Sequence, residues 1–142
     1  MLVNRGYKEV ITYSFISNEM HDFIDPKATK ILLKNPISDD MAVMRSSLWS
    51  GLIQSAKANI RRGHHNARFF ELGQCFSGTL VEDQVQKIAG IISGNRYDSQ
   101  WSNSDSTVDF FDAKADVEAL LSLSKNVYVF EEAEHPLSLI HI

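Results

Sequence analysis

The stretch that decides the fold is MAVMRSSLWSGLIQSAKANIRRGHHNARFFELGQCF, residues 41–76. Apolar residues recur at helical spacing in its middle and predict a helix over residues 48–62, which Gly63 ends. After a polar turn, an apolar run over residues 69–76 predicts a strand that is covered on both faces. The stretch therefore reads as strand, helix, basic turn and strand, and the rest of the chain is expected to pack around it.

The composition is that of a soluble globular protein. The 142 residues are 44% hydrophobic and 23% charged, which suits one domain with a substantial core. No apolar run reaches the ~18 residues that span a bilayer, so no membrane association is expected. The single cysteine, Cys75, excludes an intramolecular disulfide and makes the cytoplasm the expected compartment. The formal net charge of -4 argues against a surface that binds nucleic acid over its whole extent.

Further elements are expected on either side of this stretch. Residues 9–15 alternate in the manner of a strand, and Ser17 caps a short helix that ends at residue 24, before Pro26. The remaining expected elements are strands over residues 31–33, 85–93 and 127–130, a hairpin loop over residues 78–83, and a helix over residues 110–123 capped by Asp109. Together they predict an α+β domain with a mainly antiparallel sheet flanked by helices.

Two expectations concern packing. The last helix has an apolar stripe that is predicted to face the core, and its members are Phe110, Ala113, Val117, Leu120 and Leu121. The polar loop over residues 95–107 contains Tyr97 and Trp101. Aromatic residues in such a loop usually fasten it to the body of the domain, with stacking on a ligand as the alternative.

A search for catalytic machinery returns few candidates. The glycine-rich phosphate-binding motifs and the G-x-S-x-G elbow are absent. His64 and His65 are adjacent and would not face each other on a helix, so no metal site is expected. No catalytic residue is expected either. Glu71 lies inside an apolar strand and needs a partner to offset its desolvation, which Arg45 or a ligand would supply.

A basic cluster surrounds the end of the central helix and the turn after it. Its members are Lys57, Arg61, Arg62, His64, His65 and Arg68. One interpretation is that these cations complement the negative end of the helix dipole. The other is a local nucleic-acid contact, which a chain of negative net charge still allows.

Five runs, in this order, carry a resemblance to a known family: GYKEVITYSF (6–15), NPISDDMAVMRSSLWSGL (35–52), RFFELGQCF (68–76), GNRYDSQW (94–101) and VDFFDAKADVEALL (108–121). They resemble the catalytic-like core domain of the β subunit of bacterial phenylalanyl-tRNA synthetase. The resemblance implies a class II synthetase fold over residues 1–136, truncated at both ends, with an atypical tail over residues 137–142. The first residues, Met1 to Gly6, are in keeping with this because they read as the last turn of a longer helix.

The resemblance also implies that this domain has lost the active site. Catalytic class II domains carry F-R-x-E on a strand, and the arginine holds the ATP α-phosphate. Here Glu71 matches the glutamate, but Phe69 stands at the arginine position. The segment MRSS (44–47) lacks the histidine of the R-T-H-T-S-like sequence in the catalytic subunit, and the glycine-spaced third motif has no counterpart. We therefore expect ATP and magnesium to serve the whole synthetase without binding to this domain.

The implied partner is the synthetase α subunit, in a heterotetramer of two α and two β subunits that joins phenylalanine to tRNA(Phe). The first strand would form the subunit interface through Tyr7, Val10, Thr12, Tyr13 and Phe15. An alternative is a tRNA-binding module in which Lys57, Arg61, Arg62, His64 and Arg68 contact phosphates. A third reading, a free-standing class II-like enzyme, requires an arginine that position 69 does not supply. With both ends truncated, exposed apolar surface is expected to cause self-association.

Overall fold

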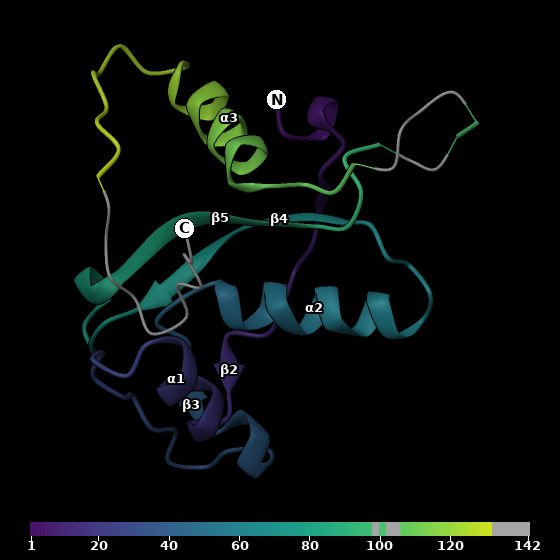
Figure 1. Cartoon of the computed structure of the whole chain (residues 1–142). Helices are drawn as coiled ribbons and strands as arrows, with labels where there is room; N and C mark the ends of the chain where they lie inside the picture. The colour runs from purple at the N-terminus through teal and green to yellow at the C-terminus, as the bar shows by residue number, and fades with distance from the viewer. Residues whose placement is uncertain (98–99, 102–105, 132–142) are drawn as a thin grey trace.

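The computed structural model describes residues 1–97, 100–101 and 106–131. In this part of the chain two small sheets combine with three α-helices and three short 3-10 helices (Figure 1). In chain order the elements are η1 Val3–Arg5, β1 Lys8–Glu9, β2 Phe15–Ile16, α1 Asn18–Ile24, η2 Asp39–Met41, β3 Val43–Met44, α2 Trp49–Arg61, β4 Ala67–Phe76, η3 Val81–Asp83, β5 Gln84–Ser93 and α3 Phe110–Leu121. The predicted α+β class is confirmed.

The larger sheet has the order β1-β4-β5. β4 and β5 form the predicted antiparallel hairpin, with a register that runs from Ala67 opposite Ser93 to Phe76 opposite Gln84. β1 pairs with β4 in parallel, so this sheet is mixed. β2 and β3 form a separate antiparallel pair beside α1. The sheet is therefore smaller and more mixed than the sequence predicted.

α2 lies along one face of the larger sheet and makes the core (Figure 1). Its apolar side is continued by Leu48 before the helix, and these residues pack on alternate residues of β4. The buried cluster consists of Leu48, Leu52, Ala56, Ala67, Phe69 and Cys75. The helix ends at Arg61, and the positive φ of Gly63, 89°, lets the chain turn into β4.

The opposite face of the sheet is only partly covered, so the prediction that β4 is buried on both sides was wrong. Leu72 is 53% exposed on this face. α3 lies over it (Figure 1), and its predicted inner stripe is only partly correct. Ala113, Leu120 and Leu121 are half-buried, but Phe110 and Val117 are exposed and the buried residue of the helix is Asp116. Polar contacts, described below, replace the apolar ones that the helical pattern predicted.

The expected strand over residues 9–15 is divided. Its beginning belongs to β1 and its end to β2, because the segment between them crosses from one sheet to the other. The strand expected over residues 31–33 is reduced to one bridge between Leu32 and Val43, and residues 127–130 form no strand. Trp101 is fully exposed and does not fasten its loop. The expected tail over residues 137–142 lies outside the described residues.

Helix ends follow the sequence closely. Ser17 Oγ accepts a hydrogen bond from the Met20 amide at 3.1 Å, and Asp109 caps α3 by accepting from the amides of Phe111 and Asp112. η1 ends at Gly6, whose φ is 85°, as a single 3-10 turn. None of the helices in the described part of the chain has the length and apolar character needed to span a bilayer.

Candidate functional site

A buried ion pair lies between the end of β3 and the middle of β4. Arg45 Nη1 is 2.7 Å from Glu71 Oε1, and both side chains are almost fully buried. Arg45 also donates through Nε to the Gln74 carbonyl at 2.9 Å. Thr12 completes the arrangement, because its hydroxyl donates to Glu71 Oε2 at 2.7 Å and accepts from Arg45 Nη1 at 3.0 Å. The structure thus brings Arg45 and Glu71 together, and the partner that Glu71 requires is internal to the chain.

Phe69 lies two residues before Glu71 on the same face of β4. It is 7% exposed and belongs to the core cluster beneath α2, with Leu48 and Leu52. Its ring offers no hydrogen-bond donor, and Arg45, the cation nearest the carboxylate in this buried group, is already paired. These residues do not fit the phosphate of ATP.

The residues expected at a subunit interface differ in where the structure places them. Tyr7 is buried and donates to Asp116, Thr12 bonds Glu71, and Val10 packs against the core cluster. Phe15 is half-buried in β2, and Tyr13 is 71% exposed. Ile11, which the sequence reasoning left out, is 92% exposed. Ile11 and Tyr13 are two residues apart on the segment between the two sheets, so both side chains project to the same side. This spacing was the signal in the sequence that could have identified Ile11.

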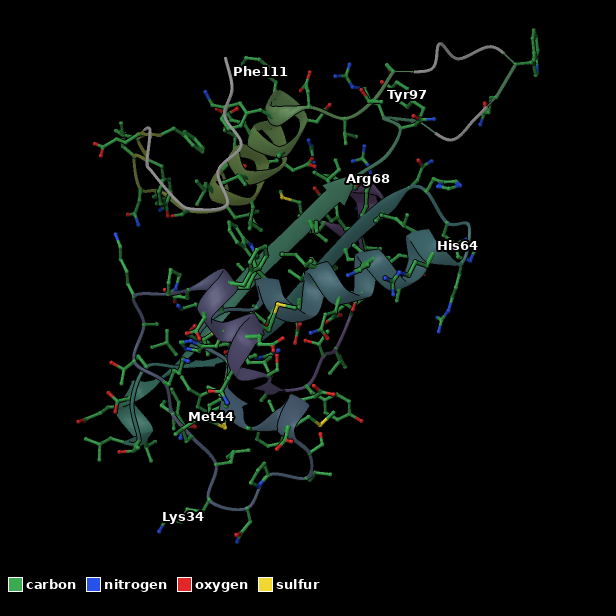
Figure 2. All side chains as sticks on the ribbon, turned by 60° about the horizontal axis from the view of Figure 1, so that its bottom comes forward. Lys34, Met44, His64, Arg68, Tyr97 and Phe111 are labelled. Atoms are coloured by element: carbon green, nitrogen blue, oxygen red, sulfur yellow. The ribbon has the colours of Figure 1, made fainter. Side chains whose placement is uncertain are left out.

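The basic cluster is divided into two parts. Lys57, Arg61, Arg62 and His64 are exposed around the end of α2. Arg68 leaves them and reaches α3: its guanidinium lies 5.9 Å from the centre of the Tyr7 ring and 3.8 Å from Asp116 Oδ2. Figure 2 shows His64 at the helix end and Arg68 on the sheet.

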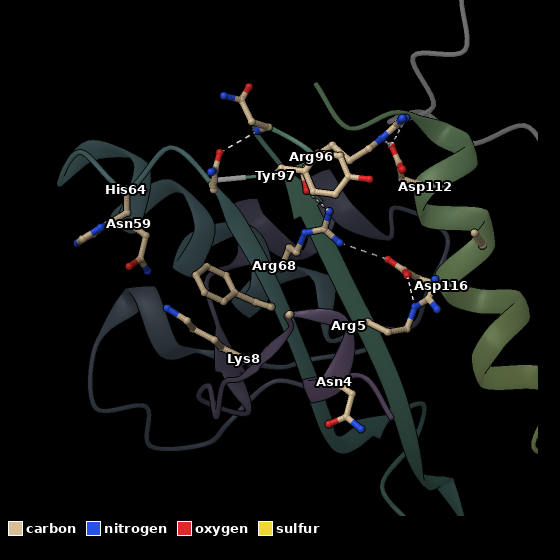
Figure 3. A pocket seen from close by; sticks show the side chains of 15 residues that line it. Asn4, Arg5, Lys8, Asn59, His64, Arg68, Arg96, Tyr97, Asp112 and Asp116 are labelled. Atoms are coloured by element: carbon tan, nitrogen blue, oxygen red, sulfur yellow. Dashed lines mark hydrogen bonds and ion pairs between the residues drawn. The ribbon is translucent and has the colours of Figure 1, made fainter. Parts of the chain in front are cut away.

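A polar cavity of about 830 Å³ opens where η1, β1, the end of α2 with the turn after it, the beginning of β4 and α3 meet (Figure 3). Asp116 lies on its α3 side and is buried. Its carboxylate accepts hydrogen bonds from Arg5 Nε and from the Tyr7 hydroxyl, the latter at 2.6 Å. Burial, and then the hydrogen bond to Asp116, raise the pKa of Tyr7 well above its usual range, so the phenol stays a donor.

A second ion pair borders the same cavity. Arg96 donates to Asp112 Oδ2 through Nη2 at 2.9 Å and through Nε at 3.2 Å. The pKa of Asp112 is lowered, first by the hydrogen bond from the Asp109 amide and then by Arg96. Asp112 and Asp116 both lie on α3 and line the cavity. Their spacing of four residues on one helix was the available signal that they act together.

No cluster of three His, Cys, Asp or Glu side chains arranged to hold a metal ion occurs within the described ranges. His64 and His65 are both exposed in the turn after α2.

Comparison with known proteins identifies the family. Residues 1–139 match the model of the phenylalanyl tRNA synthetase beta chain CLM domain. The chain belongs to this family. The CLM domain described here is 47% identical over 140 residues to the phenylalanine–tRNA ligase beta subunit of Nitrosococcus oceani and 41% identical over 139 residues to that of Coxiella burnetii. Each alignment covers 96% of this chain and 18% of the relative, so the CLM domain spans about a fifth of the length of these relatives.

The fold of this CLM domain is also found in a histidine–tRNA ligase subunit from Alicyclobacillus acidocaldarius. The two structures agree with a TM-score of 0.59 over 86% of this chain and 32% of the other. Their sequences are 14% identical, so the likeness concerns the fold alone.

Proposed function

We propose that this CLM domain is a structural, non-catalytic part of a phenylalanine–tRNA ligase β subunit. It would hold the catalytic α subunit in its active form, in a cytoplasmic complex of two α and two β subunits that attaches phenylalanine to tRNA(Phe). Membership of the family supports the assignment to a phenylalanine–tRNA ligase β subunit. The fold shared with a histidine–tRNA ligase subunit supports a class II architecture.

The non-catalytic role is supported mainly by two residues of β4, Phe69 and Glu71. Phe69 stands where the resemblance calls for a phosphate-binding arginine, and its ring is buried in the core. Glu71, the partner in that pattern, is committed to Arg45 and Thr12. A carboxylate with all its charge compensated inside the chain is poorly suited to a substrate. We therefore assign ATP and magnesium to the α subunit.

The exposed apolar residues of the first segment support the structural role. Ile11 and Tyr13 project from the connection between β1 and β2, beside the larger sheet. Large apolar side chains that neighbour each other at a surface are typical of protein interfaces. We assign Ile11, Tyr13 and Phe15 to the contact with the α subunit, whereas Tyr7, Val10 and Thr12 serve the interior of this domain.

An exchange assay tests the non-catalytic role. The chain alone is expected to catalyse no phenylalanine-dependent exchange of pyrophosphate into ATP, whereas an assembled complex of α and β subunits does so. Exchange by the chain alone, lost when Glu71 is replaced by Gln, would contradict the proposal.

A second candidate role is contact with tRNA through the end of α2. Lys57, Arg61, Arg62 and His64 are exposed together there, which a phosphate contact requires. Titration with tRNA(Phe) at low salt tests this role. We expect the double variant Arg61→Gln, Arg62→Gln to bind more weakly and with a smaller dependence on salt. Unchanged binding by the variant would remove this role.

A further inference from the structure

The outer edge of β5 is a long stretch of unpaired backbone. In the larger sheet β4 is the central strand, with β1 on one side and β5 on the other. β5 pairs with β4 over its whole length, and within the described ranges no strand pairs with its other edge. A bridge between Asn95 and Thr107 closes that edge only beyond the end of the strand. A long edge strand of this kind is a template for pairing with another strand.

The hydrogen bonds of β4 show which residues of β5 face outward. The Val10 amide donates to the Phe70 carbonyl at 2.9 Å, so the backbone groups of Phe70 point toward β1. Those of the next residue, Phe69, point toward β5, where Ile91 lies opposite. Ile91 and every second residue of β5 therefore face β4. The others present their N–H and C=O groups to the outside, and these are Gln84, Gln86, Ile88, Gly90 and Ile92.

The side chains of β5 give this edge little protection. Natural sheets usually guard an edge with charges, proline or a covering element. Lys87 is the single charged residue of the strand, which contains no proline. Val85 and Ile88 are 49% and 44% exposed, and Leu72, opposite Ile88 on β4, is 53% exposed. The edge thus offers a partner strand both backbone groups and apolar side chains.

We propose that β5 is an interaction surface for a second copy of this chain, whose own β5 pairs with it in antiparallel about a two-fold axis at Ile88. The strand is complementary to itself in this register. Ile88 lies opposite the partner's Ile88, and Val85 lies opposite the partner's Ile91. Apolar and β-branched pairs of this kind stabilise antiparallel strands. The outward backbone groups of the two copies also meet each other, as a two-fold interface requires.

The charge of the strand selects this register. Lys87 lies opposite the partner's Ala89, so the two ammonium groups do not face each other. An axis at Lys87 would place them directly opposite, which destabilises a strand pair. The pairing makes one sheet that continues through both copies. Ile11 and Tyr13 follow β1, at the other edge of the sheet, so this proposal does not depend on contact with the α subunit.

Sedimentation equilibrium of the intact chain over a dilution series tests the proposal. The unchanged chain is expected to form a dimer that dissociates on dilution. Ile88→Lys is expected to weaken the dimer at least about tenfold, because it places two ammonium groups opposite each other and removes an apolar pair. Leu72→Lys is the matched control, since Leu72 is similarly exposed on the same face but lies one strand away from the edge. Circular dichroism verifies that both variants fold.

Oxidative cross-linking tests the register. Residues opposite each other have Cα atoms about 5.5 Å apart, within reach of a disulfide. Ile88→Cys is therefore expected to form a cross-linked dimer, whereas Gln84→Cys is not, because Gln84 lies opposite the partner's Ile92. The unchanged chain, whose Cys75 is buried, gives the background. The proposal is overturned if the unchanged chain is a monomer, if Ile88→Lys and Leu72→Lys dimerise equally, or if Gln84→Cys cross-links as readily as Ile88→Cys.

Discussion

At the scale of single residues, the Arg45–Glu71 pair is the most demanding feature of the core. Each charge is removed from water, and only close compensation makes the arrangement tolerable. Further compensation comes from Thr12, which bonds both partners, and from the Gln74 carbonyl, which accepts a hydrogen bond from Arg45. The pair thereby ties the first segment, the end of β3 and the middle of β4 to each other.

Replacing Arg45 with Met is expected to lower the free energy of unfolding by about 3–5 kcal/mol, because Glu71 would remain buried without a counter-charge. The double variant Arg45→Met, Glu71→Leu should recover most of the loss, since no buried charge is then left. Urea unfolding of both single variants and the double variant measures the coupling. Effects of the two single changes that simply add would contradict this account.

Tyr7 links pH to stability at the other side of the sheet. The pKa of Tyr7 is raised in the folded chain, whereas the unfolded phenol ionises at a pH of about 10. The stabilisation is therefore fully present below about pH 10 and is lost as pH rises toward the folded pKa. Tyr7→Phe should remove this fall and cost about 1.5–3 kcal/mol at neutral pH through the lost bond to Asp116.

Urea unfolding at pH 8 to 11, compared with the exposed-site control Tyr13→Phe, checks the prediction for Tyr7. An equal fall in the free energy of unfolding for Tyr7→Phe and for the unchanged chain would contradict it.

At the scale of elements, α2 approaches the segment between β1 and β2 very closely. A Cβ built on Gly51 would lie 2.0 Å from Thr12 Oγ1, so only glycine fits. Gly51→Ala is expected to destabilise the chain by about 1–3 kcal/mol, although alanine is the better helix former by about 1 kcal/mol. Thermal unfolding of Gly51→Ala is compared with that of Ala58→Gly, a change at an exposed position of the same helix. The comparison separates the cost of the close contact from the effect of helix propensity. A stabilised Gly51→Ala variant would show that the contact relaxes freely.

The sequence correctly predicted those elements whose formation depends on residues that are neighbours in the chain. The caps Ser17 and Asp109, the stop at Gly63 and the β4–β5 hairpin all rest on neighbouring residues, and each is present. The extent of the strand predicted over residues 9–15 was wrong. Alternation of apolar and polar residues indicates an extended backbone, but it does not say which strand that backbone pairs with. The stripe of α3 was only partly correct, because Asp116 is the buried residue of that helix and its partners, Arg5 and Tyr7, lie more than a hundred residues away in sequence.

The candidate sites also differ in how far the sequence could predict them. Arg45 could be named in advance as one of two possible partners of Glu71, with a ligand as the other, because a carboxylate within an apolar run needs a partner to offset its desolvation. The polar cavity could not be predicted, since Arg5, Arg68 and Arg96 meet there only through the tertiary fold. The basic cluster looked continuous in sequence, yet strand alternation turns Arg68 away from Arg61 and Arg62.

At the scale of the whole molecule, one face of the larger sheet is closed by buried residues, whereas apolar side chains remain exposed on the segment between β1 and β2. Phe69 and the Arg45–Glu71 pair close the face of β4 beneath α2. Ile11 and Tyr13 leave apolar surface beside the sheet. This distribution of polar and apolar groups supports the proposed role of a domain that assembles with a partner and does not catalyse.

The most direct test of that claim is size-exclusion chromatography of the chain mixed with purified α subunit, for the unchanged chain, Ile11→Asp and Ile37→Asp. Both isoleucines are exposed, so both variants should fold, and Ile37 lies outside the assigned interface. The unchanged chain and Ile37→Asp are expected to co-elute with the α subunit, and Ile11→Asp to bind at least about tenfold more weakly. Separate elution of the folded, unchanged chain, or undiminished co-elution of Ile11→Asp, would contradict the account.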